Sequence, residues 1–154
     1  TASYAGGPGR EDIYVSRYHQ NQFQKPVALD TAVNTRFYEF NAFVSPNEDY
    51  IIFTSYGRKD DTGGGDLYIS LKDQQGNWKP AKHLSQLNSN QLDYCPFVSP
   101  DGKSLFFTSE RHQLPTTFAL PATYQTIQQF QTQLLNGTGN IYWISFEVLK
   151  NSLK

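Results

Sequence analysis

An internal repeat constrains the fold of this chain more than any other feature of its sequence. The segment FVSPNEDYIIFTS at residues 43–55 returns as FVSPDGKSLFFTS at residues 97–109. The same offset relates Asp12-Ile13-Tyr14-Val15-Ser16 to Asp66-Leu67-Tyr68-Ile69-Ser70, Pro26 to Pro80 and Asn34 to Asn88. Because one offset serves every pair, the two stretches are expected to share a single architecture.

Each copy of the repeat divides into short strands joined by turns. In the second copy, the predicted strands 93–99 and 104–109 flank the turn Pro100-Asp101-Gly102-Lys103. Its proline and its Asp-Gly pair are typical of a hairpin. The first copy has Asn47-Glu48 in place of Asp101-Gly102, so its turn lacks the glycine and is expected to be less favourable.

Two further predicted strands, 66–71 and 78–84, complete a set of four in the first copy. Matched quartets of strands at one offset are typical of β-propeller blades, whereas a β-sandwich would not show them. We therefore predict an all-β fold made of propeller blades with one helical insertion. Three blades are represented: the end of one at 12–29, a complete one at 39–84 and the last one at 93–147.

A propeller ring closes with at least four blades, so residues 1–154 are predicted to form only part of a ring. The missing blades are expected to belong to the same parent chain or to a second chain. The final blade lacks a predicted fourth strand.

The extra residues in the last blade, 115–139, contain a predicted short helix at about 121–135. Four apolar residues fall on one face of it: Tyr124, Ile127, Phe130 and Leu134. Pro121 lies near its start, and Gly137 is placed as its C-cap. The polar side is Gln and Thr only, so we expect the helix to pack on one face of the last blade for its stability.

Composition excludes several classes of function. The net charge is −1, with 13 basic and 14 acidic residues, so no overall field attracts nucleic acid or an anionic membrane. No apolar run is long enough for membrane insertion. Cys95 is the only cysteine and is expected to be a small buried hydrophobe.

Candidate site residues are few. The acidic loop with Asp60, Asp61 and Asp66 is a weak calcium candidate, and a glycine-rich connector between strands is the favoured interpretation. Asp66 returns as Asp12 and Asn140, which indicates a role in blade architecture. The histidines (His19, His83 and His112) show no metal-ligand spacing. We predict no catalytic residue, no metal site and no cofactor.

Aromatic residues return at fixed positions of the repeat: Tyr14, Tyr68 and Tyr142 at one, Phe53 and Phe107 at another. An aromatic platform for single-stranded nucleic acid is the functional alternative, but no basic groove accompanies it. Packing between neighbouring blades is therefore the favoured interpretation.

The segments PFVSPDGKSLFFTS followed by GNIYW, and FVSPNEDYIIFTS followed by GGDLYIS, resemble the WD40-like beta-propeller repeat (PD40) of the TolB-type family. The helical insert and the ending GNIYWISFEVLKNSLK look like the last blade of small bacterial proteins built from such repeats. The resemblance implies a six-bladed ring, a periplasmic or extracellular bacterial protein, and a binding or scaffolding role. It also implies that a strand from the other end of the chain completes the last blade.

Three functions stay open at this point. The preferred one is a non-enzymatic interaction or scaffold module that binds a protein or a cell-surface polymer. The first alternative is part of a propeller enzyme, a polysaccharide lyase or hydrolase or a peptidase-associated propeller, whose catalytic residues lie in the missing blades. The second is a purely structural subunit of an envelope assembly.

Overall fold

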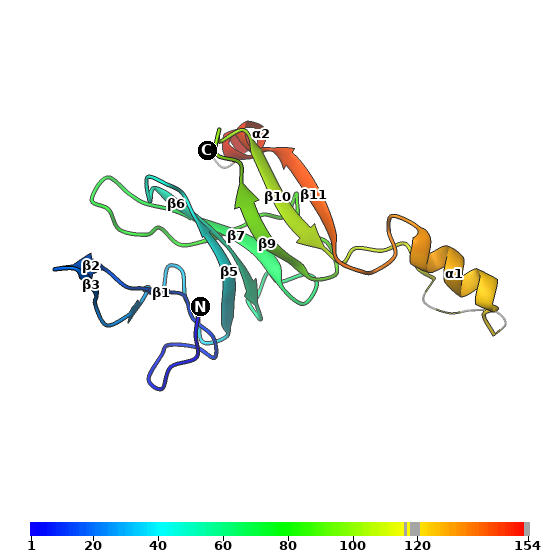
Figure 1. Cartoon of the computed structure of the whole chain (residues 1–154), viewed down its shortest axis with the longest axis horizontal. Coiled ribbons are helices and arrows are strands. Elements are labelled where there is room, and N and C mark those ends of the chain that lie inside the picture. Colours follow the sequence, from blue (N-terminus) through cyan, green and yellow to red (C-terminus); the bar gives the residue numbers. More distant parts are fainter. Residues whose placement is uncertain (116, 118–120, 153–154) are drawn as a thin grey trace.

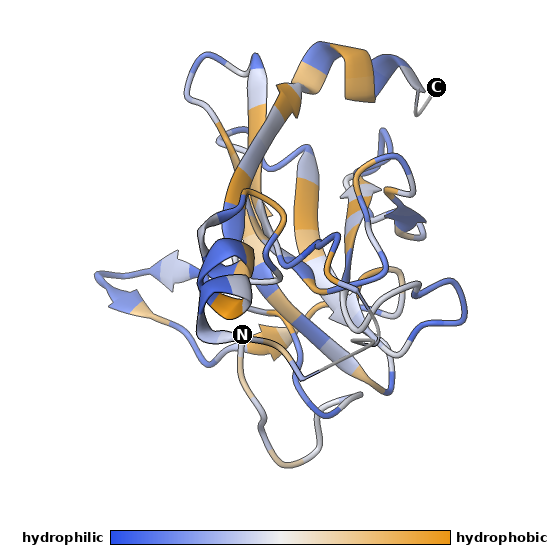
Figure 2. Cartoon of the chain, turned by 90° about the vertical axis from the view of Figure 1, so that its right-hand side faces the viewer, coloured by the Kyte–Doolittle hydropathy of each residue, from blue (hydrophilic) through white to orange (hydrophobic). Residues whose placement is uncertain are grey.

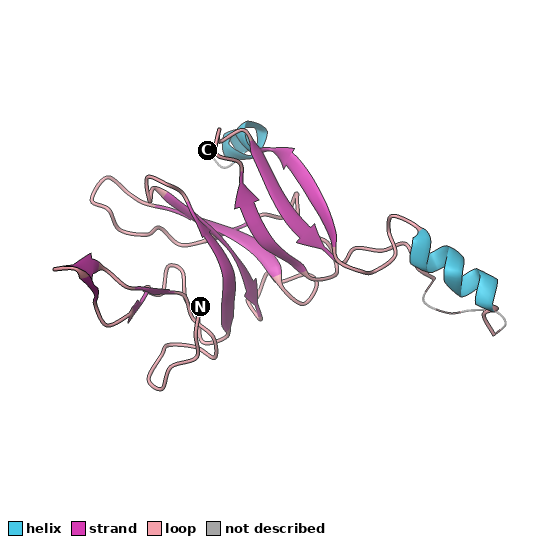
Figure 3. Cartoon of the chain, viewed as in Figure 1, coloured by secondary structure: helices cyan, strands magenta, loops and turns pink. Residues whose placement is uncertain are grey.

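A computed structural model describes residues 1–115, 117 and 121–152 of the chain. Within these residues the fold is mostly β, with four antiparallel sheets and two helices (Figures 1 and 3), so the expected all-β class is confirmed at this level. The predicted insertion includes residues 116 and 118–120, which lie outside the described residues.

The largest sheet has four strands that pair antiparallel in chain order, β5-β6-β7-β8. Their bounds are Tyr38–Val44 for β5, Tyr50–Tyr56 for β6, Asp66–Leu71 for β7 and Lys82–His83 for β8. The last strand is much shorter than the predicted 78–84. Pro80 lies inside that range and has no N–H to donate to the ladder, and only an isolated bridge joins Lys72 to Trp78.

The second large sheet repeats this arrangement with three strands, in the order β11-β10-β9. Its strands are β9 (Asp93–Val98), β10 (Ser104–Ser109) and β11 (Asn140–Ser145), followed directly by helix α2 (Phe146–Ser152). Phe107 pairs with Tyr142 as Phe53 pairs with Tyr68 in the larger sheet. The sequence repeat is therefore a repeat of strand pairing. Helix α2 was not expected from the sequence, and it follows β11 where a fourth strand would follow β7.

The N-terminal segment forms two small two-stranded sheets. Strands β1 (Tyr14–Val15) and β4 (Val27–Ala28) pair with each other, and β2 (Tyr18–His19) pairs with β3 (Gln22–Phe23) between them. The predicted strands 12–18 and 23–29 are each interrupted. Gln20 and Asn21 have φ of 51° and 62°, which turns the chain tightly between β2 and β3 and makes a hairpin that projects from the molecule (Figure 1).

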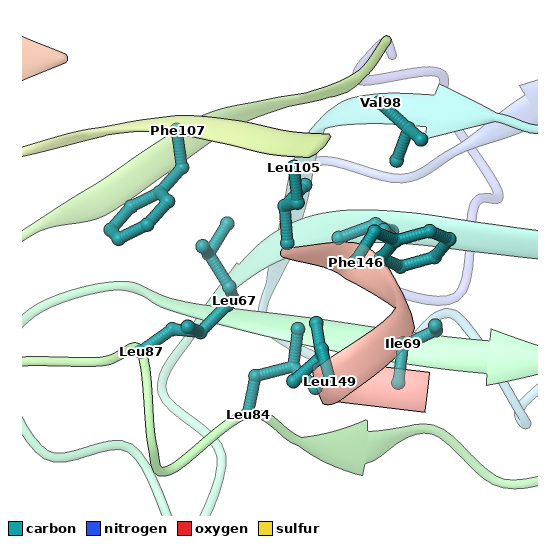
Figure 4. Close-up of a cluster of buried hydrophobic side chains, with 10 residues drawn as sticks. Leu67, Ile69, Leu84, Leu87, Val98, Leu105, Phe107, Phe146 and Leu149 are labelled. Atoms are coloured by element: carbon teal, nitrogen blue, oxygen red, sulfur yellow. The ribbon is translucent and has the colours of Figure 1, made fainter. Parts of the chain in front are cut away.

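The four-stranded sheet is buried on both of its faces. On β6, Ile52 points into one cluster, which lies against strands β9 and β10 and helix α2 (Figure 4), while Ile51 and Phe53 point into the other, against the N-terminal segment. Successive strand residues face opposite sides, so an uninterrupted apolar run is what a strand covered on both faces needs.

The first cluster contains these buried side chains: Ile52, Leu67, Ile69, Leu84, Leu87, Val98, Leu105, Phe107, Phe146 and Leu149. The second contains Ile13, Val33, Ile51, Phe53 and Tyr68. Helix α2 supplies two members of the first cluster and so covers its outer end (Figure 4).

Helix α1, Tyr124–Thr132, lies within the predicted range, but the prediction that it packs on the last blade is wrong. None of its residues is buried, and it extends away from the sheets (Figure 1). Ser109 pairs with Asn140 and His112 bridges to Asn136, so the insertion leaves from the end of the β10–β11 hairpin. Neither described helix is long and apolar enough to cross a membrane.

The ends of α1 are capped by residues that the sequence did not indicate. The Thr123 hydroxyl is the N-cap and accepts a hydrogen bond from the Thr126 amide. Gln133 is the C-cap, so the expected C-cap role of Gly137 is wrong.

The expectation that Cys95 is buried is also wrong, because a bulge turns its side chain outward. Cys95 is exposed and has a φ of 51°, and the β9–β10 register shifts between Phe106 and Thr108. Asn41 occupies the same place in the first copy, with a φ of 48°. The bulge is therefore part of the repeat, and asparagine tolerates its left-handed backbone better than cysteine does.

The two hairpin turns differ in backbone strain. Glu48 has a φ of 54° at the position where the second copy has Gly102 with a φ of 69°. We expect Glu48→Gly to raise the free energy of unfolding by about 0.5–1 kcal/mol, because relief of the left-handed strain exceeds the added chain entropy of glycine. Urea unfolding measures the change.

The control is Glu48→Gln, which keeps the strain and removes the exposed ion pair with Lys72. This variant is expected to match the wild type closely, because exposed pairs contribute little. A Glu48→Gly protein less stable than the control would contradict the strain argument.

Candidate functional site

A partly buried arginine, Arg58, lies at the centre of the four-stranded sheet's polar network. Arg58 donates to the Ser55 hydroxyl at 2.8 Å and to the Val33 carbonyl at 2.5 Å, and its guanidinium lies 3.4 Å from the Glu39 carboxylate. The same guanidinium lies 4.7 Å from the ring centroid of Tyr68. It therefore joins strands β5, β6 and β7 to the loop before β5.

The three-stranded sheet contains the same network. Arg111 donates to the Ser109 hydroxyl at 2.8 Å, to the Leu87 carbonyl at 2.5 Å and to the Asp93 carboxylate at 3.1 Å. It lies 4.6 Å from the ring centroid of Tyr142. Every partner is the counterpart of one in the first copy, which makes this network an architectural element of the repeat.

Sequence reasoning missed this network, although the sequence has an acidic residue at the same repeat position in both copies, Glu39 and Asp93. Glu39 and Asp93 are different acids, so identity matching did not connect them, and Arg111 lies one residue short of the constant offset. Both carboxylates are fully buried and accept a hydrogen bond from the amide and the hydroxyl of a residue four positions earlier, Thr35 or Ser89. A buried acid paired with an arginine is the expected way to hold charge in a core.

The repeated aromatic residues lie mostly in the core, as expected. Phe53 and Tyr68 are fully buried or nearly so and pair with ring centroids 6.2 Å apart. Phe107 is buried and Tyr142 is half-buried, at 5.9 Å. Tyr14 contacts Tyr4. These rings are packed against other groups, which argues against a stacking platform for bases.

The weak calcium candidates lie in the loop before β7 and at the first residue of β7, and their carboxylates bind protein donors. Asp61 accepts hydrogen bonds from the amides of Gly57, Gly63, Gly64 and Gly65. Asp60 accepts one from the Tyr68 hydroxyl. Within the described ranges, no group of three or more His, Cys, Asp or Glu side chains could hold a metal ion.

Burial by itself raises the pKa of the Asp61 carboxyl, but the four glycine amides together hold this pKa below its usual value. Asp66 is fully buried, and one of its oxygens accepts hydrogen bonds from the Thr62 amide and hydroxyl. These contacts support the interpretation of the loop as a connector between strands.

The three histidines lie on different elements. His83 on β8 lies 2.8 Å from the Asp66 carboxylate and packs against the Tyr68 ring. His19 lies on the projecting hairpin, and His112 lies at the base of the insertion, where it accepts a hydrogen bond from the Leu114 amide. The structure does not bring these imidazoles together.

A hollow of about 840 Å³ lies between the N-terminal segment and the turn end of the four-stranded sheet. Its charged and aromatic lining includes Arg17, Tyr18, Glu48, Lys72 and Trp78. Lys72 lies 3.4 Å from the Glu48 carboxylate and 4.7 Å from the Trp78 ring centroid. An aromatic ring beside a pair of opposite charges can bind a polar partner. Sequence reasoning did not indicate this surface.

Comparisons with family models, curated proteins and solved structures gave no match to this chain.

The arginine network is expected to contribute to stability in both sheets. Arg58→Lys keeps the charge but loses the planar fork that reaches Ser55 and Val33 together, so we expect the free energy of unfolding to fall by roughly 2 kcal/mol. Arg111→Lys is the matched variant, and its effect should be smaller because the Arg111 side chain is 29% exposed against 13% for Arg58. Urea unfolding of both variants measures the difference. Equal stability of wild type and Arg58→Lys would contradict the argument.

Proposed function

We propose that this chain forms consecutive blades of a β-propeller with PD40-type repeats, and that the ring is a non-enzymatic interaction module. Two sheets with the same strand order and the same arginine network support the proposal. The remaining blades come from the same parent protein or from a second chain. A periplasmic or extracellular bacterial location is part of the proposal and is supported by the family resemblance alone.

The observation that carries the proposal is a repeated apolar face. The four-stranded sheet packs onto the three-stranded sheet through side chains that include Phe43, Ile52, Leu67 and Ile69. Their counterparts on the three-stranded sheet are Phe97, Phe106, Ile141 and Trp143. Of these, Phe97, Ile141 and Trp143 are 50%, 77% and 69% exposed, and hydrophobic segments are visible on this side of the molecule (Figure 2).

The other faces of the two sheets also correspond. Ile51, Phe53 and Tyr68 pack toward the N-terminal segment, and their counterparts Leu105, Phe107 and Tyr142 pack toward the four-stranded sheet. The four-stranded sheet therefore contacts the segment before it through one set of positions and the sheet after it through another, and the three-stranded sheet uses the first set in the same way. Such a head-to-tail step can be repeated around an axis, which favours a propeller over a two-sheet sandwich.

An interaction role is supported by how the polar side chains of these sheets are used. The buried carboxylates, the two arginines and the Asp66–His83 pair bind groups of the repeat itself. The large hollow beside Trp78 offers aromatic and charged groups at the surface, where a protein or a cell-surface polymer can bind.

The exposed face of the three-stranded sheet is expected to be an interface. We predict that the chain associates as its concentration rises and that Trp143→Asp abolishes this, because a charge cannot be buried there without a partner. Trp143 is chosen because the Phe97 ring also packs against Phe43 of the four-stranded sheet. Light scattering after size-exclusion chromatography measures the mass. Val148→Asp is the control, since Val148 is 60% exposed on helix α2. A chain that is monomeric at all concentrations would count against an interface on this face.

The function itself is tested with purified polymers. The chain is incubated with cell-wall peptidoglycan and with acidic and neutral capsular polysaccharides, and co-sedimentation is measured together with release of reducing ends and unsaturated sugars. We expect binding to at least one polymer without release of products, and Trp78→Ala should weaken it. Release of products would instead support the alternative of a propeller lyase or hydrolase. Binding to none of them would leave a protein as the proposed partner, to be sought by cross-linking in envelope fractions.

A further inference from the structure

A second concave surface lies on the side of the four-stranded sheet that faces helix α2. Its volume is about 470 Å³, within the range of small-molecule sites. Its apolar lining is Tyr50, Ile69, Leu71 and Pro80, and its charged lining is Asp49, Lys79, Lys82 and Lys150. We call this surface the lysine groove.

The apolar floor of the lysine groove is a continuation of the main core. Tyr50 pairs with Leu71 and Ile69 pairs with Lys82, so these side chains share one face of the sheet. Further along the same face, Phe146 and Leu149 of helix α2 cover Ile69 and its neighbours (Figure 4). Ile69 is buried and Tyr50 packs against Phe146 with the ring centroids 5.2 Å apart, so the groove lies at the margin of α2, where Tyr50 and Leu71 are only partly covered.

The rim of the groove is positively charged. Its lining contains three lysines and one acid, and the Asp49 carboxylate already accepts a hydrogen bond from the Ser45 hydroxyl at 2.5 Å. Outside the lining, the pKa of the Asp73 carboxyl is lowered chiefly by the hydrogen bond from the Asn77 amide, and Lys79 lies close enough to help lower it. The chain as a whole has a net charge of −1, so this excess of positive charge is local. The ammonium group of Lys150 lies 5.0 Å from the ring centroid of Phe146, which holds it beside the floor.

We propose that the lysine groove binds a small organic anion with an apolar body, of the class of medium-chain carboxylates. The body lies on Tyr50 and Leu71, and the carboxylate binds the ammonium groups of Lys79 and Lys150. Charge near apolar surface strengthens such an ion pair relative to water. A cation with the same body lacks this attraction and meets the lysine charges instead. The inference does not depend on the propeller proposal, because every lining residue belongs to this chain.

The probe for the test is decanoate below its micelle concentration, with decylamine as the matched cation. Isothermal titration and NMR shifts of the Tyr50 and Leu71 signals follow binding. We expect decanoate to bind at least tenfold more tightly than decylamine, and its affinity to fall as sodium chloride is raised. Shifts confined to the exposed face around Phe97 would overturn the assignment to the groove.

Paired charge-removing variants test the role of the lysines. Lys79→Gln with Lys150→Gln is expected to weaken decanoate binding about tenfold, which corresponds to about 1.4 kcal/mol. Lys25→Gln with Lys59→Gln removes the same charge from exposed positions outside the groove and should leave binding unchanged. Both double variants must unfold at the wild-type temperature. Equal binding by the two double variants would overturn the proposal.

A last comparison separates a small anion from an acidic peptide. A short peptide of alternating glutamate and leucine is titrated under the same conditions. If the peptide binds in the groove and decanoate does not, the proposal of a small organic anion is overturned in favour of a protein partner. If decanoate binds in the groove and the peptide displaces it, the two compete for one site and the proposal is supported.

Discussion

A sheet that is apolar on both faces cannot be stable alone, and the rest of this structure follows from that constraint. On β6, Ile51 and Phe53 face one way and Ile52 faces the other, and all three are fully buried. Each buried side chain of this size contributes about 1.5–3 kcal/mol. The four-stranded sheet therefore needs a layer on each side, which the N-terminal segment and the three-stranded sheet supply.

The two arginines of the polar networks explain how such layers keep their order. Apolar contacts alone are not directional, whereas a guanidinium that binds a serine, a carbonyl and a carboxylate specifies the distance between strands. Arg58 and Arg111 do this at equivalent places. The repeat thus combines non-directional apolar burial with directional hydrogen bonds from one arginine. The same division explains why most polar groups of these sheets bind other groups of the repeat, and why the binding surfaces that we propose lie at its margins.

Much of the fold could be predicted from the sequence, because the repeat and the turn residues report on local geometry. The strands around Gly102 and Glu48 are examples. Other features depend on contacts between distant residues. The exposure of Cys95 depends on a bulge. Helix α1 projects from the sheets because the insertion leaves the sheet beyond the pair of Ser109 with Asn140. The lysine groove depends in part on where helix α2 lies against the sheet, because Lys150 belongs to α2, and no local pattern indicated this helix.

The insertion leaves and re-enters the sheet at two paired residues, so the number of residues in it can change without a change in the sheet. Since Ser109 and Asn140 are already paired, the register of β10 and β11 is set before the chain departs toward α1. The entropy of closing a loop grows only slowly with the number of residues in it. Related chains can therefore lengthen, shorten or replace this arm over evolutionary time while the three-stranded sheet keeps its shape, which makes the arm the natural place for one such protein to diverge from another.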